Sequence, residues 1–207
     1  MRKTLPLFLP FLFVALFLPG ITMAENKIVG PLEMVRSASD AILGRVISDK
    51  AIIEKDRAHV VELINELLIP HIDDRTIAQR VLGKVWDTAS ESQREIFARE
   101  FRHYLVRFYA QVLLLYSGEK VEYSSVEKAS QPDVRKVSSM ISRTGEVPIE
   151  AAYRVELRSV EWKVTDIIVD GVSLVKANQS QFKHMIARDG LDKVSSMLEA
   201  RNNRPFR

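Results

Sequence analysis

Residues 90–118 read SESQREIFAREFRHYLVRFYAQVLLLYSG, and the residue pattern of the chain changes at the end of this stretch. Ser90 and Gln93 fit a capping box, in which the serine side chain accepts from the backbone and the glutamine side chain reaches back. We therefore predict a long helix from Ser90 to about Tyr116. Its apolar side is unusually wide and aromatic, with Phe97, Phe101, Tyr104, Leu105, Phe108, Tyr109, Val112, Leu113 and Tyr116.

Beyond Ser117-Gly118 the apolar residues recur with a period of two, which is typical of strands. The predicted strands are Lys120 to Glu127, Val134 to Arg143, Val147 to Val160, and Glu161 to Val169. In the third strand we expect inward side chains at Val147, Ile149, Ala151, Tyr153, Val155 and Leu157. Outward side chains are expected at Glu150, Arg154, Glu156 and Arg158. The pattern predicts a sheet with one buried face and one wet face.

Helical spacing is found on both sides of these strands. The predicted helices are Pro31 to Val46, Arg57 to Ile69, Asp74 to Leu82, Gln179 to Arg188, and Leu191 to Leu198. Pro70 is expected to stop the second of them, and Gly83 to cap the third. Helices followed by consecutive antiparallel strands and further helices indicate an α+β fold.

The N-terminus has the pattern of a secretory signal peptide. Met1-Arg2-Lys3 is basic, Leu5 to Leu18 is apolar, and small residues end at Ala24, after which we expect cleavage. The apolar run has 14 residues, fewer than the roughly 20 of a spanning helix. Residues 25–207 would then form a single exported domain. Because the chain has no cysteine, it has neither a disulfide framework nor a lipoprotein acylation site.

The charge balance and the motifs exclude several classes of function. Without Arg2 and Lys3 the chain has 28 basic and 27 acidic residues, so nothing suggests nucleic acid as a partner. Neither of the two glycine-rich phosphate-binding motifs occurs, and no histidine pair has a close metal spacing. His71 with Asp73 and Asp74 could ligate a metal, but a helix start after a polar turn explains them better. We expect no metal and no cofactor.

Several segments together resemble the MlaC family of phospholipid-binding proteins, also called toluene-tolerance proteins. They occur in the family's order along nearly the whole exported chain: His71-Ile72-Asp73, Val81-Leu82-Gly83-Lys84-Val85-Trp86, Gln93 to Tyr116, Ser117-Gly118-Glu119-Lys120-Val121, Trp162-Lys163-Val164, Gly171-Val172-Ser173-Leu174-Val175, Gln181-Phe182 and Gly190-Leu191-Asp192. One departure is Asp74, where the family usually has an aromatic residue.

This resemblance implies a curved antiparallel sheet of about four strands, wrapped by six to seven helices, with an internal apolar pocket. It also implies a periplasmic carrier of phospholipid that belongs to the Mla lipid-asymmetry system. The implied partners are an outer-membrane complex of MlaA with a porin and an inner-membrane ATP-driven transporter, reached through its MlaD component. The phospholipid would be cargo rather than a cofactor.

The wall of the pocket is predicted from helix spacing and strand alternation. The expected lipid-binding residues are Val81, Leu82, Trp86, Phe101, Tyr104, Leu105, Phe108, Tyr109, Val112, Leu113, Tyr153, Val155 and Val172. A charge on this wall, as in Leu105→Asp or Val112→Asp, is expected to release lipid with a modest loss of fold.

The same sequence is compatible with two other functions. The first is a small periplasmic enzyme that acts on an apolar substrate, with Asp166, Asp170 or His103 as base; it requires a polar group with a shifted pKa inside the cavity. The second is a structural adaptor whose core is filled by its own side chains. The periodicity of an apolar face does not distinguish a filled core from a cavity.

Overall fold

The computed structural model of the chain describes residues 28–206, and the predicted signal peptide over residues 1–24 lies outside this part. Its helices are α1 (Pro31–Ser48), α2 (Lys50–Lys55), α3 (His59–Leu67), η1 (Ile69–His71), α4 (Asp74–Leu82), α5 (Lys84–Thr88), α6 (Glu91–Leu113), α7 (Leu174–Asp189) and α8 (Leu191–Asn202). Its strands are β1 (Lys120–Lys128), β2 (Val134–Ser142), β3 (Ile149–Arg158), β4 (Glu161–Val169) and β5 (Val172–Ser173). The predicted α+β class is confirmed.

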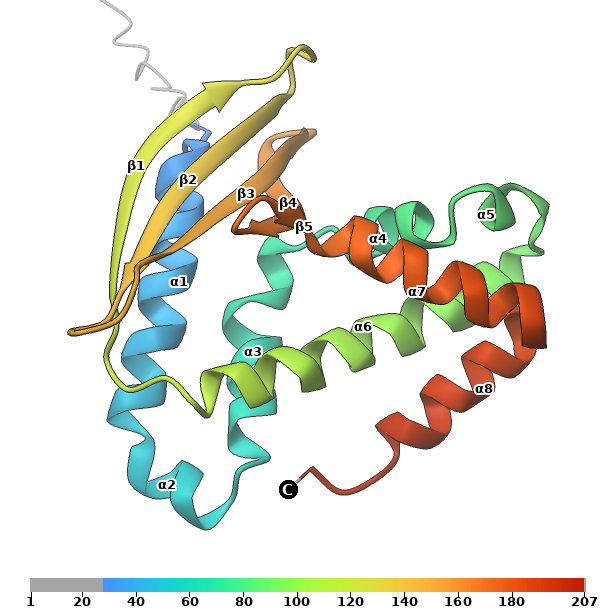
Figure 1. The fold of residues 1–207 in the computed structure, drawn as a ribbon, viewed down its shortest axis with the longest axis horizontal. Coiled ribbons are helices and arrows are strands. Elements are labelled where there is room, and N and C mark those ends of the chain that lie inside the picture. The colour runs from blue at the N-terminus through green and yellow to red at the C-terminus, as the bar shows by residue number, and fades with distance from the viewer. Residues whose placement is uncertain (1–27, 207) are drawn as a thin grey trace, which may run out of the picture.

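The five strands form one open antiparallel sheet in chain order, so each strand pairs with its neighbour in sequence. The ladder is interrupted between Tyr123 and Ser125 and again beside Arg154 and Val155. Such bulges bend a sheet. Figure 1 shows the long curved strands with α1 running along one face, whereas α4 to α8 extend away from the sheet.

The apolar side chains gather in three clusters rather than in one core. The first joins α4, α6, α7 and α8 around Phe97, Phe101 and Phe182, whose ring centroids lie 5.4–5.6 Å apart. The second joins α1, α2 and α3 to the C-terminal half of α6, and the third lies between α1 and the sheet. Helix α6 therefore belongs to two cores at once.

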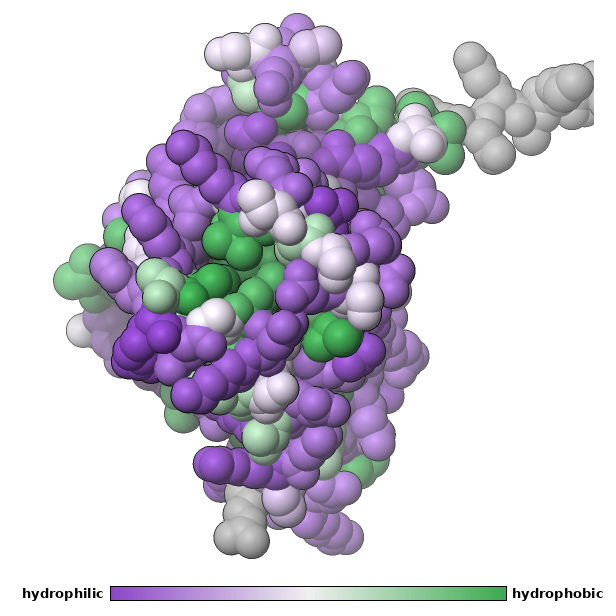
Figure 2. Space-filling model, turned by 90° about the vertical axis from the view of Figure 1, so that its right-hand side faces the viewer, coloured by the Kyte–Doolittle hydropathy of each residue, from purple (hydrophilic) through white to green (hydrophobic). Residues whose placement is uncertain are grey.

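The first core is not covered on every side by polar residues. Half-buried apolar side chains from α5 and α7 pack against it, namely Val85, Met185 and Ile186. Figure 2 looks at the end of the molecule where α5 lies and shows apolar residues in a hollow that hydrophilic residues surround. Apolar surface is thus accessible at this end of the helical half.

The helix boundaries agree best with the prediction where a cap is encoded locally. Helix α4 has the predicted bounds, and in the predicted capping box the Gln93 amide donates to Ser90 Oγ at 3.2 Å. Helix α7 begins earlier than predicted, because Ser173 caps it by accepting from the Lys176 amide. The short helices α2 and α5 were not predicted, since five or six residues are too few to show a period.

The expected alternation along β3 holds only in part. Val155 and Ala151 are buried as predicted, but Val147 is 88% exposed and Ile149 is also exposed. Val147 precedes β3, which begins at Ile149 rather than at the predicted Val147. Glu156, predicted to be wet, is only 6% exposed. The prediction of a wet outer face is therefore wrong at this position.

Glu156 is buried because arginines from two elements enclose it. Its carboxylate accepts from Arg80 Nη2 at 2.5 Å, Arg158 Nη2 at 2.7 Å and Arg154 Nε at 2.9 Å. Burial by itself would raise the pKa of the carboxyl, but these hydrogen bonds outweigh it and lower the pKa to about 2. Arg80 belongs to α4, so the cluster fastens that helix to the sheet.

We predict that Glu156→Gln lowers the free energy of unfolding by about 2 kcal/mol near neutral pH, because three guanidinium groups lose their charged acceptor. Since the folded pKa is lowered, the stabilisation is complete above the ordinary carboxyl pKa and is lost as the pH falls toward 2. Urea titrations followed by circular dichroism at pH 7 and pH 3 should therefore show a smaller difference between variant and parent at pH 3. The control is Glu161→Gln, whose exposed carboxylate pairs with Lys163. An equal loss in both variants would contradict this role of Glu156.

Candidate functional site

A cavity lies between α6 and β4 and is closed by α3, η1, α4 and α7. Its volume is about 50 Å³, and part of it is open to solvent. The lining residues are Ile64, Leu68, Ile69, Ile72, Asp74, Ile77, Phe101, Arg102, Leu105, Val106, Tyr109, Val164, Asp166, Ile167, Leu174, Val175 and Asn178. This volume is below that of pockets that hold drug-sized ligands, roughly 300–1,000 Å³, so the walls must move apart to admit a lipid tail.

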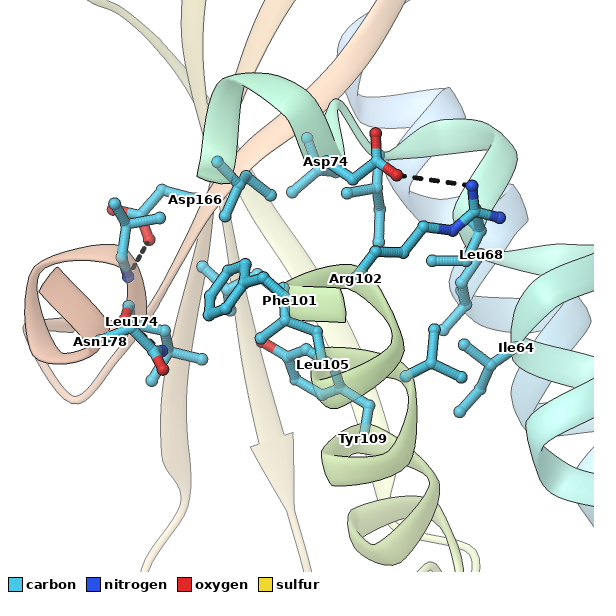
Figure 3. A pocket seen from close by; sticks show the side chains of 17 residues that line it. Ile64, Leu68, Asp74, Phe101, Arg102, Leu105, Tyr109, Asp166, Leu174 and Asn178 are labelled. Atoms are coloured by element: carbon cyan, nitrogen blue, oxygen red, sulfur yellow. Dashed lines mark hydrogen bonds and ion pairs between the residues drawn. The ribbon is translucent and has the colours of Figure 1, made fainter. Parts of the chain in front are cut away.

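The middle of the cavity is apolar. Phe101, Leu105 and Tyr109 follow one another at intervals of four along α6, so their side chains share one face of the helix. Figure 3 shows these three at the centre, with Ile64 and Leu68 on one side of them and Leu174 on the other. Such a wall favours hydrocarbon over water.

The opposite wall is shaped by the bulge in β4. The ladder pairs Ile167 with Tyr153 but Val164 with Val155, so Thr165 is the extra residue. Val164 and Ile167 therefore share the same face of the sheet, although three positions separate them, and both reach the cavity. A regular strand would have turned one of them to the other face.

Polar groups lie at two ends of the cavity, as Figure 3 shows. At one end Arg102 Nη1 faces Asp74 Oδ2 at 3.5 Å. At the other end the Asp166 carboxylate accepts from Ser173 Oγ at 2.5 Å and from the Val175 amide at 3.1 Å, which joins β4 to the first turn of α7. The cavity is thus an apolar space between two polar ends.

Tyr109 lines the cavity and has a pKa above the ordinary value of a phenol. Burial is the main cause, with a smaller contribution from the nearby Asp166 carboxylate, and both raise the pKa of the phenol. The hydroxyl therefore stays protonated at neutral pH. A group in this state does not act as a base.

The structure brings three of the thirteen sequence-predicted lipid contacts to this cavity: Phe101, Leu105 and Tyr109. The other ten lie elsewhere, and their contact with lipid stays a prediction. Those in the helical core are Val81, Leu82, Trp86 and Tyr104. Leu113 packs in the second core, and Tyr153 and Val155 lie under α1. Those exposed at the surface are Phe108, Val112 and Val172.

Most of the cavity wall was not identified from the sequence. Ile64 and Leu68 belong to an apolar helix face that the spacing does reveal, but nothing in the spacing shows what that face contacts. Leu174 and Val175 lie in the first turn of α7, which was predicted to start later. The Ser173 cap three residues before Lys176 is the local signal that would have found this turn.

The three bases considered for an enzyme do not form a common site. Asp166 lines the cavity, but its carboxylate is occupied by Ser173 and Val175. Asp170 is exposed in a turn, and His103, which is also exposed, has its Nδ1 3.7 Å from Glu100 Oε2. Neither of these two lines the cavity.

The possible metal ligands around residue 73 have structural partners. Asp73 caps α4 by accepting from the amide and the hydroxyl of Thr76, and it also accepts from Arg158 Nε at 2.8 Å. Among residues 28–206 there is no group of three or more side chains arranged to hold a metal ion. Within the same residues no helix combines the length and the hydropathy that crossing a bilayer requires.

The fold and the cavity define a class of α+β proteins with an apolar cavity between a helix layer and a curved antiparallel sheet. The family model described as MlaC protein matches residues 36–200, and the chain belongs to this family.

The similar proteins come from three bacteria. The intermembrane phospholipid transport system binding protein MlaC of Haemophilus influenzae is 23% identical over 96% of this chain and 92% of its own length. Toluene tolerance protein ttg2D of Pseudomonas putida is 26% identical over 84% of this chain and 80% of its own. The structure of a phospholipid-binding protein from Ralstonia solanacearum, in complex with a phospholipid, matches with a TM-score of 0.76 and 27% identity over 84% of this chain and 97% of its own.

We predict that Asp166→Asn lowers the free energy of unfolding by about 1–2 kcal/mol, because a neutral amide replaces a charged acceptor at the start of α7. Asp170→Asn is the matched control. Asp170 has a positive φ of 47°, which asparagine tolerates well, and the asparagine oxygen can keep its bond from the Glu150 amide, so the replacement should change little. Thermal or urea unfolding measures both, and equal stability of the two variants would refute the role given to Asp166.

Proposed function

We propose that this chain is a periplasmic carrier that holds the acyl part of a phospholipid in the cavity between α6 and β4 and moves it between the two membranes. The observation that carries the proposal is the apolar cavity itself, with its polar groups confined to the ends. Lipid tails match such a wall, and a polar headgroup matches such an end.

The physical requirement on a carrier is severe. Each methylene exposed to water costs about 0.8 kcal/mol, so a chain of sixteen carbons costs on the order of 12 kcal/mol. A protein that moves phospholipid through water must therefore enclose the tails. A core filled completely by the protein's own side chains would leave no room, and the small apolar cavity marks the place where side chains would have to move apart around a tail.

The relatives support the same function. The Haemophilus protein is named for intermembrane phospholipid transport, and the Ralstonia structure contains a phospholipid. For this chain the system implies an outer-membrane MlaA–porin complex as one partner and the inner-membrane transporter, through MlaD, as the other. The predicted leader over residues 1–24 would bring the chain to the periplasm, between them.

Transport of this kind needs no catalytic group, because no covalent bond is broken. The enzyme hypothesis would require a base in the cavity. The raised pKa of Tyr109 and the occupied carboxylate of Asp166 give it no support. We therefore propose a carrier that is not an enzyme, with lipid as its cargo.

Native mass spectrometry of gently purified protein tests the carrier. We expect a population whose added mass equals that of a phospholipid, released on collisional activation and identified by its fragments. Repeated preparations with no bound lipid, followed by failure to take lipid from vesicles, would refute the proposal.

We predict that Leu105→Asp abolishes this added mass, because a carboxylate in the cavity would face the lipid tails without water. The sequence pattern led us to expect the same effect from Val112→Asp, but the side chain of Val112 is 50% exposed and lies outside the wall of the proposed cavity. Val112→Asp becomes the matched control and should keep its lipid.

Both variants introduce the same charge on the same helix, so a general effect on α6 would appear in each. Circular dichroism should show that both remain folded. Loss of lipid in both, or in neither, would contradict the placement of the tails beside Leu105.

A further inference from the structure

The cavity has a single cationic lining residue among those the structure describes, and this is Arg102. Its side chain is 39% exposed, and that of its partner Asp74 is 32% exposed, so both reach solvent at the end of the cavity. The ion pair is long, at 3.5 Å, and Arg102 Nε is buried without a hydrogen-bond partner. The guanidinium therefore has unused capacity to donate.

The two ends of the cavity differ in charge. Around Asp166 the polar groups are its carboxylate, the Ser173 hydroxyl, the Val175 amide and the Asn178 side chain, whose Nδ2 donates to the Leu174 carbonyl, with no lining cation. A phosphate placed there would face a carboxylate. At the other end it would face a guanidinium, whose planar fork suits two phosphate oxygens. A lipid phosphate therefore belongs at the Arg102 end.

We propose that Arg102 and Asp74 together recognise the headgroup of the lipid and select zwitterionic phospholipids, of the ethanolamine type, over anionic ones. This proposal rests on the carrier function proposed above. The lipid phosphate pairs with the Arg102 guanidinium. The ammonium group, which two carbons link to the phosphate, pairs with the Asp74 carboxylate. The long Arg102–Asp74 ion pair of the free protein is thereby replaced by two ion pairs with the lipid headgroup.

An anionic headgroup such as phosphoglycerol has no ammonium group, so it forms only one of these two ion pairs. Its phosphate occupies Arg102 and leaves the Asp74 carboxylate beside a lipid of net negative charge, with no cation in return. Because both side chains are partly exposed, solvent screens the difference, and we expect a preference of about two- to five-fold.

Competition between two lipids with identical acyl chains measures this preference directly. The protein is stripped of lipid and incubated with vesicles of equal parts phosphatidylethanolamine and phosphatidylglycerol, and bound lipid is identified by native mass spectrometry. The parent should hold about two to five times more of the ethanolamine lipid. Asp74→Asn should bring the ratio close to one, because the amide neither attracts the ammonium nor repels the anionic lipid.

Arg102→Gln gives a second, independent readout. It removes the phosphate partner of both lipids, so the total amount bound should fall while the ethanolamine lipid stays preferred. Asp40→Asn, on the exposed side of α1, makes the same chemical change away from the cavity and should leave the ratio unchanged. Circular dichroism checks Asp74→Asn, since this residue is the first of α4.

The outcomes separate the two proposals. If the parent binds lipid in the proportion of the vesicle, or if Asp74→Asn keeps the parent's ratio, headgroup selection by this pair is overturned and the carrier stands. Full lipid retention by Arg102→Gln would likewise overturn its role as the phosphate partner. If the parent takes up no lipid of either kind, the carrier itself fails.

Discussion

The structure depends on the way in which α6 is held at both ends and left free of the sheet along its middle. Near its start Phe97 and Phe101 stack on each other and contact Phe182 of α7 edge to face. Near its end Val106 and Ala110 pack into the core around α3. The helix packs chiefly against α3, α4 and α8 rather than against a strand. The space that remains between α6 and β4 is the cavity.

A second constraint determines the position of the cavity end formed by Asp74 and Arg102. The segment before α4 runs beside β4, since the Asp73 amide donates to the Val164 carbonyl at 3.0 Å and Ile72 bridges Val164. Arg158 of β3 also pairs with Asp73, and Glu156 binds Arg80 further along α4. These contacts hold the start of α4 against the sheet. Asp74 is thereby placed at the cavity, opposite Arg102 of α6.

Together these constraints suit a molecule that must release what it binds. The tails would be held by apolar contact, which has no preferred direction and needs no bond to be broken. The proposed headgroup end is made of partly exposed charges that solvent screens, and such charges select between ligands more than they strengthen binding. A carrier with this division of roles can select its lipid without holding it too tightly to pass on.

The amino-acid sequence by itself determined the elements whose signals are local. The Ser90–Gln93 capping box, the bounds of α4 and the bounds of β4 all follow from neighbouring residues, as does the α+β order. Capping interactions and hydrophobic periodicity involve only neighbouring residues, so a short stretch of sequence is enough to predict them.

Only the tertiary structure decided what each apolar face contacts. The wide aromatic side of α6 is divided between a core at Phe97, a cavity at Leu105 and solvent at Phe108, although all three look alike in the pattern. The burial of Glu156 depends on Arg80, 76 residues away, and the bulge at Thr165 breaks the alternation that would have revealed the wall. Periodicity shows that a helix face is apolar, but whether that face is covered, and by what, is decided by distant parts of the chain.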